Sequence, residues 1–273
     1  PEQPLSQLPL LTAEERHQLL ITWNTTGRDF LQDRCIHHMF EQQVAQTPHA
    51  VALLSQHASL TYQELNRRAN QVAHYLQCLG VGPETPVGLC VERTLAMATG
   101  LLGIMKAGAV YVPLDPSYPT ERLAFMLADA RVAVLLTQEH LLARLPESSG
   151  TVLCLDTAWP AIARHSSHNP PHTSTPASTA YILYTSGSTG RPRGVVGSHR
   201  AFLNTCAWMW HAYPFTAQEV CCQHASLSFV DSLEEILEPL LQGIPTVIIP
   251  DAVLKEPRQF IQTLSQHQVT RLI

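Results

Sequence analysis

Apolar and polar positions follow a helical period in some parts of this chain and an extended period in others. Apolar residues at helical spacing predict one helix over Ile36–Gln46 and a second over Tyr62–Leu79. The second helix stops at Gly80, a residue type that is common just after a helix end. The runs Val51–Leu54 and Val87–Val91 are apolar and have the length of buried strands. The first part of the chain therefore predicts helices that alternate with strands.

The alternation continues through the next part of the chain, as helix, strand, helix and strand. The predicted segments are 95–107, 109–113, 121–130 and 132–137, and a further strand is expected over 180–184. Helices and strands that alternate at this spacing are typical of a mostly parallel sheet with helices on both faces. We therefore expect an α/β fold.

Three segments depart from this rhythm. Residues 1–30 are polar apart from an amphipathic stretch over Thr12–Trp23, where Thr12 and Glu15 form a capping box, so this part reads as a linker. Residues 166–178 are rich in Ser, His, Pro and Thr and predict a mobile surface segment. Val269–Ile273 reads as the start of a buried strand, so we expect the chain to be a piece of a larger protein.

Composition excludes several classes of protein. The 273 residues are 45% hydrophobic and 14% charged, which allows a large core, and the net charge of −5 without a basic run argues against a nucleic-acid partner. The seven cysteines are too few for a disulfide scaffold and show no zinc spacing, so we expect reduced thiols, no metal-ligating residues in this chain and a cytoplasmic protein. The longest apolar run, Ala96–Met105, is too short to span a membrane.

The strongest candidate for chemistry is the hydroxyl- and glycine-rich segment Tyr184–Val195. Its glycines allow the backbone to approach a ligand closely, and Arg191 and Arg193 add donors suited to phosphate oxygens. The segment is not a Walker loop, because Pro192 and Arg193 stand where that motif needs Gly and Lys. By composition alone, a plain linker remains an equal alternative to a loop that folds over a polyphosphate.

The same segment resembles the signature loop of the adenylate-forming superfamily, whose members usually carry Lys where this chain has Arg191 and Arg193. Further motifs in the order of the nonribosomal peptide synthetase branch are Leu60–Leu65, Met105–Asp115 and Pro116–Leu123, and Leu8–Thr12 resembles the linker after a condensation domain. The chain is thus identified as a member of this branch. The resemblance implies stacked, mostly parallel sheets flanked by helices, with residues 1–30 as linker and 31–273 as a truncated N-terminal part of an adenylation domain.

The resemblance also implies a reaction. A substrate carboxylate attacks the α-phosphorus of ATP, pyrophosphate leaves with Mg²⁺ and the loop holding its phosphates, and the acyl group then passes to a phosphopantetheine thiol on a carrier protein. Carrier and condensation domains of the same multienzyme are the implied partners. The family's ribose-binding acid, Mg²⁺-binding acid and lid lysine would follow residue 273, so we expect this chain alone to be inactive. The implied pyrophosphate-binding residues are Thr185, Ser186, Gly187, Ser188, Thr189, Gly190 and Arg193.

A second motif, Leu227–Ile236, bears on the substrate. Peptide synthetases carry Phe-Asp-x-Ser here, and the Asp pairs with the α-ammonium of the amino acid, whereas this chain has Val230 followed by Asp231. The Val-Asp pair is similar to domains that activate β-alanine or other β-amino acids. The resemblance places Phe229 between nucleotide and substrate and lets Glu234 bind a second amine. The competing interpretation is a capping box, Ser232 with Glu235, ahead of a helix from Leu233 to about Leu241.

Two other functions remain open. An acyl-CoA synthetase for an amine-free acid would leave Asp231 without a charge to meet, and a non-catalytic nucleotide-binding or docking module would account for the arginine replacements. His165, His168 and His172 read as solvated side chains rather than metal ligands, and His199 reads as a helix start.

Overall fold

The computed structural model describes residues 10–27, 33–56, 58–147, 150–186 and 191–272, which form two compact units, Pro1–Phe30 and Leu31–Ile273. The described part of the first unit contains α1 (Ala13–Leu20) and the short 3₁₀ helix η2 (Thr22–Asn24). The capping box predicted for Thr12 and Glu15 is confirmed: each side chain accepts a hydrogen bond from the other residue's backbone N–H. Helix α1 buries none of its residues.

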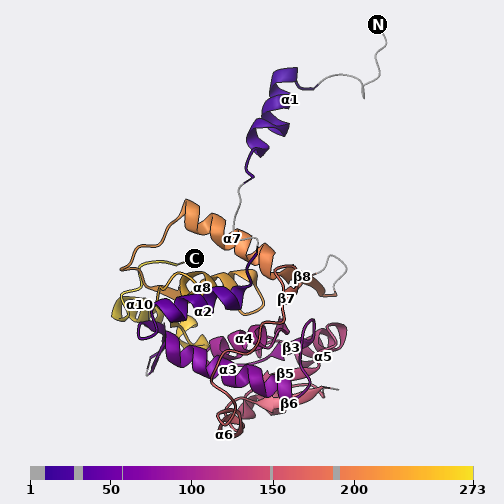
Figure 1. Cartoon of the computed structure of the whole chain (residues 1–273), viewed down its shortest axis with the longest axis vertical. Helices are drawn as coiled ribbons and strands as arrows, with labels where there is room; N and C mark the ends of the chain where they lie inside the picture. Colours follow the sequence, from indigo (N-terminus) through magenta and orange to yellow (C-terminus); the bar gives the residue numbers. More distant parts are fainter. Residues whose placement is uncertain (1–9, 28–32, 57, 148–149, 187–190, 273) are drawn as a thin grey trace. The chain divides into compact units, whose positions relative to one another are not determined.

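The second unit contains a six-stranded sheet whose middle strands are parallel (Figure 1). Its last pair, β7 with β8, is antiparallel, so the chain returns directly on itself at this edge. In spatial order the strands are β6 (Thr151–Cys154), β5 (Val134–Thr137), β3 (Pro86–Leu89), β4 (Val110–Pro113), β7 (Thr179–Thr185) and β8 (Arg193–Ser198).

A four-stranded sheet forms the second layer of strands. Its order is β2 (Ser59–Thr61), β1 (Val51–Leu54), β10 (Thr246–Ile248) and β9 (Cys221–Gln223). The pairs β1–β10 and β10–β9 are parallel, and β1–β2 is antiparallel. On the free side of β9, Cys221 forms a single parallel bridge with Arg271. The strand expected over Val269–Ile273 is therefore a single bridge within the described residues.

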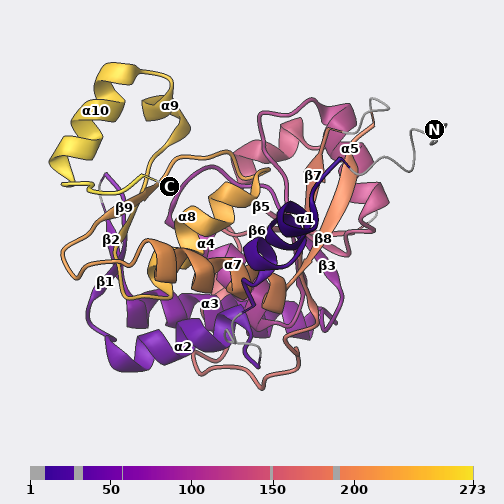
Figure 2. The same cartoon turned by 90° about the horizontal axis from the view of Figure 1, so that it is seen from above.

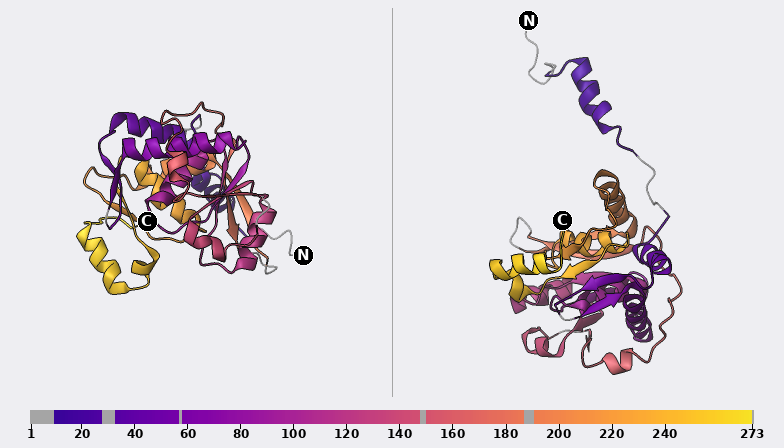
Figure 3. Two further views of the ribbon diagram at one scale, coloured as in Figure 1. Left: turned by 90° about the horizontal axis from the view of Figure 1, so that it is seen from below. Right: turned by 90° about the vertical axis from the view of Figure 1, so that its left-hand side faces the viewer.

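Helices cover both faces of each sheet. The main core joins both sheets through α2, α3, α4 and α8, while α5 covers the outer face of the larger sheet and α9 with α10 covers the outer face of the smaller one. Figure 2 shows α5 and α10 on opposite sides of this unit, and the yellow α10 lies at its edge in both views of Figure 3. The helices are α2 (Ile36–Gln46), α3 (Tyr62–Cys78), α4 (Leu95–Lys106), α5 (Thr120–Asp129), α6 (Trp159–Ile162), α7 (His199–Ala212), α8 (Val230–Leu240), α9 (Asp251–Leu254) and α10 (Pro257–Gln266), with the 3₁₀ helix η3 (Glu139–Arg144).

Strand β5 shows how the sequence produces these layers. Because successive side chains of a strand point to opposite faces, Val134 and Leu136 join the main core while Leu135 packs in the cluster beneath α5. All three side chains are almost fully buried. A continuous apolar run, without polar alternation, is what a strand covered on both faces requires.

The expected α/β fold with stacked, mostly parallel sheets is confirmed. The segment 166–178 has no helix or strand, as expected, but several of its groups are anchored: Asn169 accepts a hydrogen bond from Asn70, and the Ser174 carbonyl accepts one from the Cys35 thiol. His168 and His172 of this segment are exposed, but both have partners. The His172 ring lies beside the Glu41 carboxylate, and the backbone carbonyl of His168 is hydrogen-bonded to the His74 ring. Among the described residues, no helix has the length and apolar character needed to cross a membrane.

The capping box predicted for Ser232 and Glu235 is wrong. Helix α8 begins at Val230, so Ser232 lies inside its first turn, and the N-cap residue Phe229 makes no side-chain capping bond. The Ser232 hydroxyl donates to the carbonyls of Leu227 and Phe229 instead. The Glu235 side chain is fully buried and accepts hydrogen bonds from backbone amides of another loop.

Candidate nucleotide and substrate site

The hydroxyl-rich segment lies at the turn of the β7–β8 hairpin. Strand β7 ends at Thr185, Ser186 follows it, and β8 begins at Arg193, which pairs with Thr185 across the hairpin. The predicted phosphate-binding residues Gly187, Ser188, Thr189 and Gly190 lie outside the described residues. The hairpin is fixed next to its turn because the Tyr184 hydroxyl donates a 2.7 Å hydrogen bond to Asp129 on α5.

A cavity of about 700 Å³ opens beside this hairpin. It brings together Thr185 and Ser186 from the end of β7 with Phe229 and Val230 from the start of α8. Its volume lies in the range of sites that enclose a molecule the size of a cofactor. Its remaining lining residues are Tyr118, Arg122, Tyr181, Leu183, Tyr184, Val195 and Ser228.

An adjoining cavity of about 620 Å³ carries positive charge. Arg122 and Ser186 line both cavities, and Arg191 lines the second one. The Arg122 guanidinium stacks on the Tyr118 ring, with 3.8 Å between the guanidinium carbon and the ring centre. Its Nε atom is buried and has no hydrogen-bond partner among the described residues. The stacking fixes a cation that lines both cavities and whose planar donors suit phosphate oxygens.

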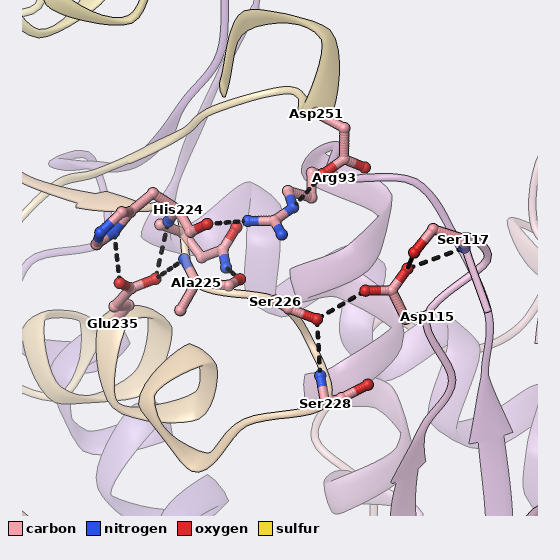
Figure 4. A network of polar contacts seen from close by, with 10 residues as sticks. Arg93, Asp115, Ser117, His224, Ala225, Ser226, Ser228, Glu235 and Asp251 are labelled. Atoms are coloured by element: carbon pink, nitrogen blue, oxygen red, sulfur yellow. Dashed lines mark hydrogen bonds and ion pairs between the residues drawn. The ribbon is translucent and has the colours of Figure 1, made fainter. Parts of the chain in front are cut away.

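The loop between β9 and α8 is held from below by a buried carboxylate (Figure 4). Glu235 accepts 2.8 Å hydrogen bonds from the backbone amides of His224 and Ala225, and its other oxygen lies 2.5 Å from His224 Nδ1. Burial raises the pKa of Glu235, while these amides and the imidazole act to lower it. These contacts fix the loop that leads into Phe229.

The other side of the same loop is held by two charged residues from the larger sheet's loops (Figure 4). Arg93 donates to the His224 carbonyl and forms a 2.7 Å ion pair with Asp251. Asp115, just after β4, accepts a 2.6 Å hydrogen bond from the Ser226 hydroxyl. Burial acts to raise the pKa of Asp115, but hydrogen bonds from Ser117 and Ser226 outweigh it and lower that pKa. The loop before Phe229 therefore joins both sheets.

The three predicted substrate residues do not all reach the cavity. Phe229 lines it, whereas Asp231 is exposed on the first turn of α8 and is not among the lining residues. Glu234 is half-buried on the same helix; burial and the neighbouring charges of Asp231 and Glu235 raise its pKa. Arg193, predicted as a phosphate contact, is exposed on β8 and lines neither cavity.

Sequence reasoning missed Arg122 and Tyr118. They stand four positions apart in Pro116–Leu123, a stretch used above only as a family motif. An aromatic residue followed at this spacing by an arginine at the start of a helix was a usable signal for a stacked cation. The role of Glu235 was missed because a capping box with Ser232 offered an explanation from neighbouring residues. Its actual partners lie ten and eleven positions earlier in the chain.

The model of the AMP-binding enzyme family matches residues 40–273 of this chain. The chain belongs to the AMP-binding enzyme family. The match covers both sheets, the β7–β8 hairpin and the start of α8, so the two cavities lie within it.

Curated relatives at about 40% identity are large synthases. The chain is 39% identical over 271 residues to tyrocidine synthase 3 of Brevibacillus parabrevis, covering 99% of this chain and 4% of that protein. It is 40% identical over 275 residues to chondramide synthase cmdD of Chondromyces crocatus, covering 100% of this chain and 7% of that protein. The chain thus spans a small fraction of the relatives it matches.

Solved structures show the same fold. A crystal structure of the nonribosomal peptide synthetase FmoA3 with AMPPNP bound matches with a TM-score of 0.83 and 29% identity, over 90% of this chain and 26% of that chain. The N-terminal subdomain of Klebsiella oxytoca NpsA matches with a TM-score of 0.79 and 26% identity, over 88% of this chain and 61% of that one. The chain therefore has the fold of the N-terminal part of a nonribosomal peptide synthetase adenylation domain.

Proposed function

We propose that the polypeptide containing this chain activates an amino acid with ATP, giving an aminoacyl adenylate that is loaded onto the phosphopantetheine thiol of a carrier protein in the cytoplasm. One observation carries the proposal: the end of the hydroxyl-rich hairpin and the start of the substrate motif, more than forty positions apart in sequence, line a single 700 Å³ cavity. Family membership and the AMPPNP-bound relative support ATP as the nucleotide.

The cavity offers the groups that the first step needs. The ATP phosphates would meet the Thr185 and Ser186 hydroxyls together with the Arg122 and Arg191 guanidiniums, which offset the charge that builds on departing pyrophosphate. Gly187, Ser188, Thr189 and Gly190 belong to the same proposed loop. Mg²⁺ bound to the phosphates would supply further charge neutralisation.

Phe229 separates nucleotide from amino acid in this proposal. Its side chain is 60% exposed at the start of α8 and lines the cavity, and the carboxylate to be activated would lie beside it. The fixed loop behind Phe229 holds it in place, through Glu235 on one side and Asp115 on the other. This fixed position is what an enzyme needs to align a carboxylate with the α-phosphorus.

We further propose a β-amino acid, such as β-alanine, as the substrate. Val230 lines the cavity where the family's Asp would pair with an α-ammonium, and the nearest carboxylate is Asp231, one position further along α8. A substrate whose ammonium is one carbon further from its carboxylate suits this shift. Glu234, three positions beyond Asp231 on the same helix, would accept a second amine or a polar group.

Pyrophosphate exchange by the complete polypeptide tests both parts of this proposal. We expect ATP-dependent exchange with β-alanine exceeding that with α-alanine, and Asp231→Asn lowering the β-alanine rate by about 10- to 100-fold, the value of a charge-assisted hydrogen bond. Glu256→Gln, at an exposed position before α10, is the matched control. A preference for α-alanine would rule out the β-amino acid. Exchange only with amine-free acids would favour an acyl-CoA synthetase.

Loss of the loop hydroxyls tests the nucleotide part separately. We expect the variant with Ser186, Ser188 and Thr189 all changed to alanine to lose most exchange activity while keeping its circular dichroism spectrum. Full turnover in this variant would refute phosphate binding by the loop. A complete polypeptide that binds ATP but exchanges with no acid would instead be a non-catalytic nucleotide-binding module.

A further inference from the structure

A cluster of metal-ligating side chains lies at the start of α2, within the second unit and outside the cavity residues described above. Cys35 is the N-cap residue of α2, and His37 and His38 belong to its first turn. One possible ligand atom from each of these three residues lies within 4.8 Å of the others. The sulfur–nitrogen and nitrogen–nitrogen separations in tetrahedral zinc sites are about 3.3–3.7 Å, so small side-chain rotations would bring the three atoms to bonding positions.

The nitrogen atoms of this cluster are buried without partners. His37 is 2% exposed, and its Nδ1 atom makes no hydrogen bond with any described residue. The Nε2 atom of His38 is also buried and makes no hydrogen bond with any described residue. Two adjacent imidazoles that bury unsatisfied nitrogen atoms are costly for a fold, and a bound cation would satisfy both at once.

A further imidazole, that of His172, lies beside this cluster and comes from the segment that precedes β7. The ring of His172 lies 3.8 Å from the ring of His38 and 5.7 Å from the ring of His37, measured between centroids. Its Nε2 atom lies 3.4 Å from a carboxylate oxygen of Glu41. In metal sites a carboxylate commonly orients a ligating imidazole through its second nitrogen, which leaves Nδ1 of His172 for the ion.

His199 is close to the cluster but has a different role. Its ring lies 5.3 Å from the ring of His37, and its Nδ1 atom accepts a 3.4 Å hydrogen bond from the backbone amide of Ile36. Because Nδ1 accepts this bond, the neutral imidazole carries its proton on Nε2, and neither nitrogen has a lone pair free for a metal ion. The donor set is therefore one sulfur and three nitrogens.

We propose that Cys35, His37, His38 and His172 bind a zinc ion. A thiolate with imidazoles is the donor set that Zn²⁺ prefers, and four protein ligands leave no open position, which is typical of a structural site. On binding, the Cys35 thiol gives up its hydrogen bond to the Ser174 carbonyl, releases its proton to solvent and forms the sulfur–metal bond. The ion would tie α2 to the segment 166–178, which leads into β7, the strand that ends at the nucleotide cavity.

The spacing of these four residues explains why no sequence motif predicts the site. Cys-x-His-His differs from the typical zinc-finger spacings, and the fourth proposed ligand lies more than 130 positions later in the chain. The sequence predicts no metal and a solvated His172. Only the fold brings the segment containing His172 against the start of α2.

Cobalt binding to the full chain tests the proposal, because Co²⁺ occupies zinc sites and its thiolate bond absorbs in the near ultraviolet. After removal of bound metal with a chelator, in reducing buffer, we expect this absorption to saturate at about one Co²⁺ per chain and to disappear when Zn²⁺ is added. Cys35→Ser should abolish the band. His38→Gln and His172→Gln should each weaken Co²⁺ binding by at least about tenfold, since even loss of an outer partner costs 10- to 100-fold.

The chain supplies a matched control. Cys78 is exposed, and its sulfur lies 3.8 Å from His165 Nδ1, so this pair offers the same donor types without burial. Cys78→Ser should leave the cobalt band unchanged. The proposal fails if no band forms, if the band survives in Cys35→Ser, or if it is lost in Cys78→Ser. Should Cys35→Ser not fold by circular dichroism, unchanged Co²⁺ affinity in both histidine variants would refute it.

Discussion

Glu238 is a carboxyl group in the interior that lacks a hydrogen bond to one of its oxygens. It is 1% exposed on α8, and its Oε1 atom has no partner among the described residues. Burial, reinforced by the charge of Glu234, raises its pKa from 4.5 to about 8. At neutral pH this side chain is therefore protonated in the folded protein and ionised in the unfolded chain.

This difference makes stability depend on pH. Because the folded state keeps a proton that the unfolded chain has released, the free energy of unfolding falls as pH rises from about 4.5 to about 8. Glu238→Gln removes this loss, so we expect it to stabilise the protein at about pH 8.5 by roughly 1–3 kcal/mol and by much less at about pH 5. Urea unfolding at the two pH values measures the effect, with Glu256→Gln as the exposed control. A gain that does not depend on pH would contradict the argument.

Arg122 is the residue through which the two cavities share a cation. Its stacking on Tyr118 fixes the guanidinium without using its donors. We expect Arg122→Ala to weaken ATP binding to the complete polypeptide by about 10- to 100-fold, the value of a hydrogen bond to a charged group. Arg164→Ala, at an exposed position after α6, is the control. Equal nucleotide affinity in both variants, measured by calorimetry, would remove Arg122 from the proposed site.

At the residue scale, local signals predicted local roles. The Thr12–Glu15 capping box was predictable because both partners stand within one helical turn. The same logic was wrong for Ser232 and Glu235, since Glu235 satisfies the backbone amides of His224 and Ala225. Partners brought together by the fold, such as Asp115 and Ser226, have no spacing that a sequence pattern can display.

At the element scale, the contact between α3 and α4 depends on a glycine. A methyl group on Gly103 of α4 would lie 2.5 Å from Val72 Cγ1 and 3.2 Å from the backbone oxygen of Ala69, both on α3. We expect Gly103→Ala to lower the free energy of unfolding by about 1–3 kcal/mol, because overpacking outweighs the helix propensity of alanine. Thermal or urea unfolding measures the change.

Two further variants isolate the cause of this loss. Gly82→Ala introduces a methyl group into open space, so its effect should lie within about 0.5 kcal/mol. In a Val72→Ala background, the cost of Gly103→Ala should fall only in part, because Cγ1 is gone while Cβ of residue 72 stays 2.7 Å from the added methyl group. A cost that is as large in that background as in the original chain would contradict the assignment of the effect to the contact with Val72.

The elements that could be predicted were those long enough to show a period. Helices α2, α3 and α4 appeared close to their observed bounds, because apolar residues repeat over three or more turns. Strands β9 and β10, with 3 residues each, give no such signal. Strand β8 was missed because it is exposed over most of its length and begins inside the hydroxyl-rich segment.

At the scale of the whole molecule, the two sheets were predictable only through family resemblance. Alternating helices and strands indicate a parallel sheet, but nothing in the order of elements says that β1 pairs with β10 rather than with β3. That pairing joins residues almost two hundred positions apart. The candidate cavity depends on this arrangement, because α8 reaches the β7–β8 hairpin from within the layer of helices between the two sheets.

Removal of residues 1–30 tests the division of the chain into two units. Helix α1 has 8 residues and buries none of them, and the described residues 10–27 are all exposed. A helix this short gains little stability from its own hydrogen bonds, so the unit Leu31–Ile273 should not depend on it. We expect the shortened chain to unfold within about 0.5 kcal/mol of the original in urea, as for a surface change. A larger loss would show that this segment stabilises the second unit, and would contradict its interpretation as a linker.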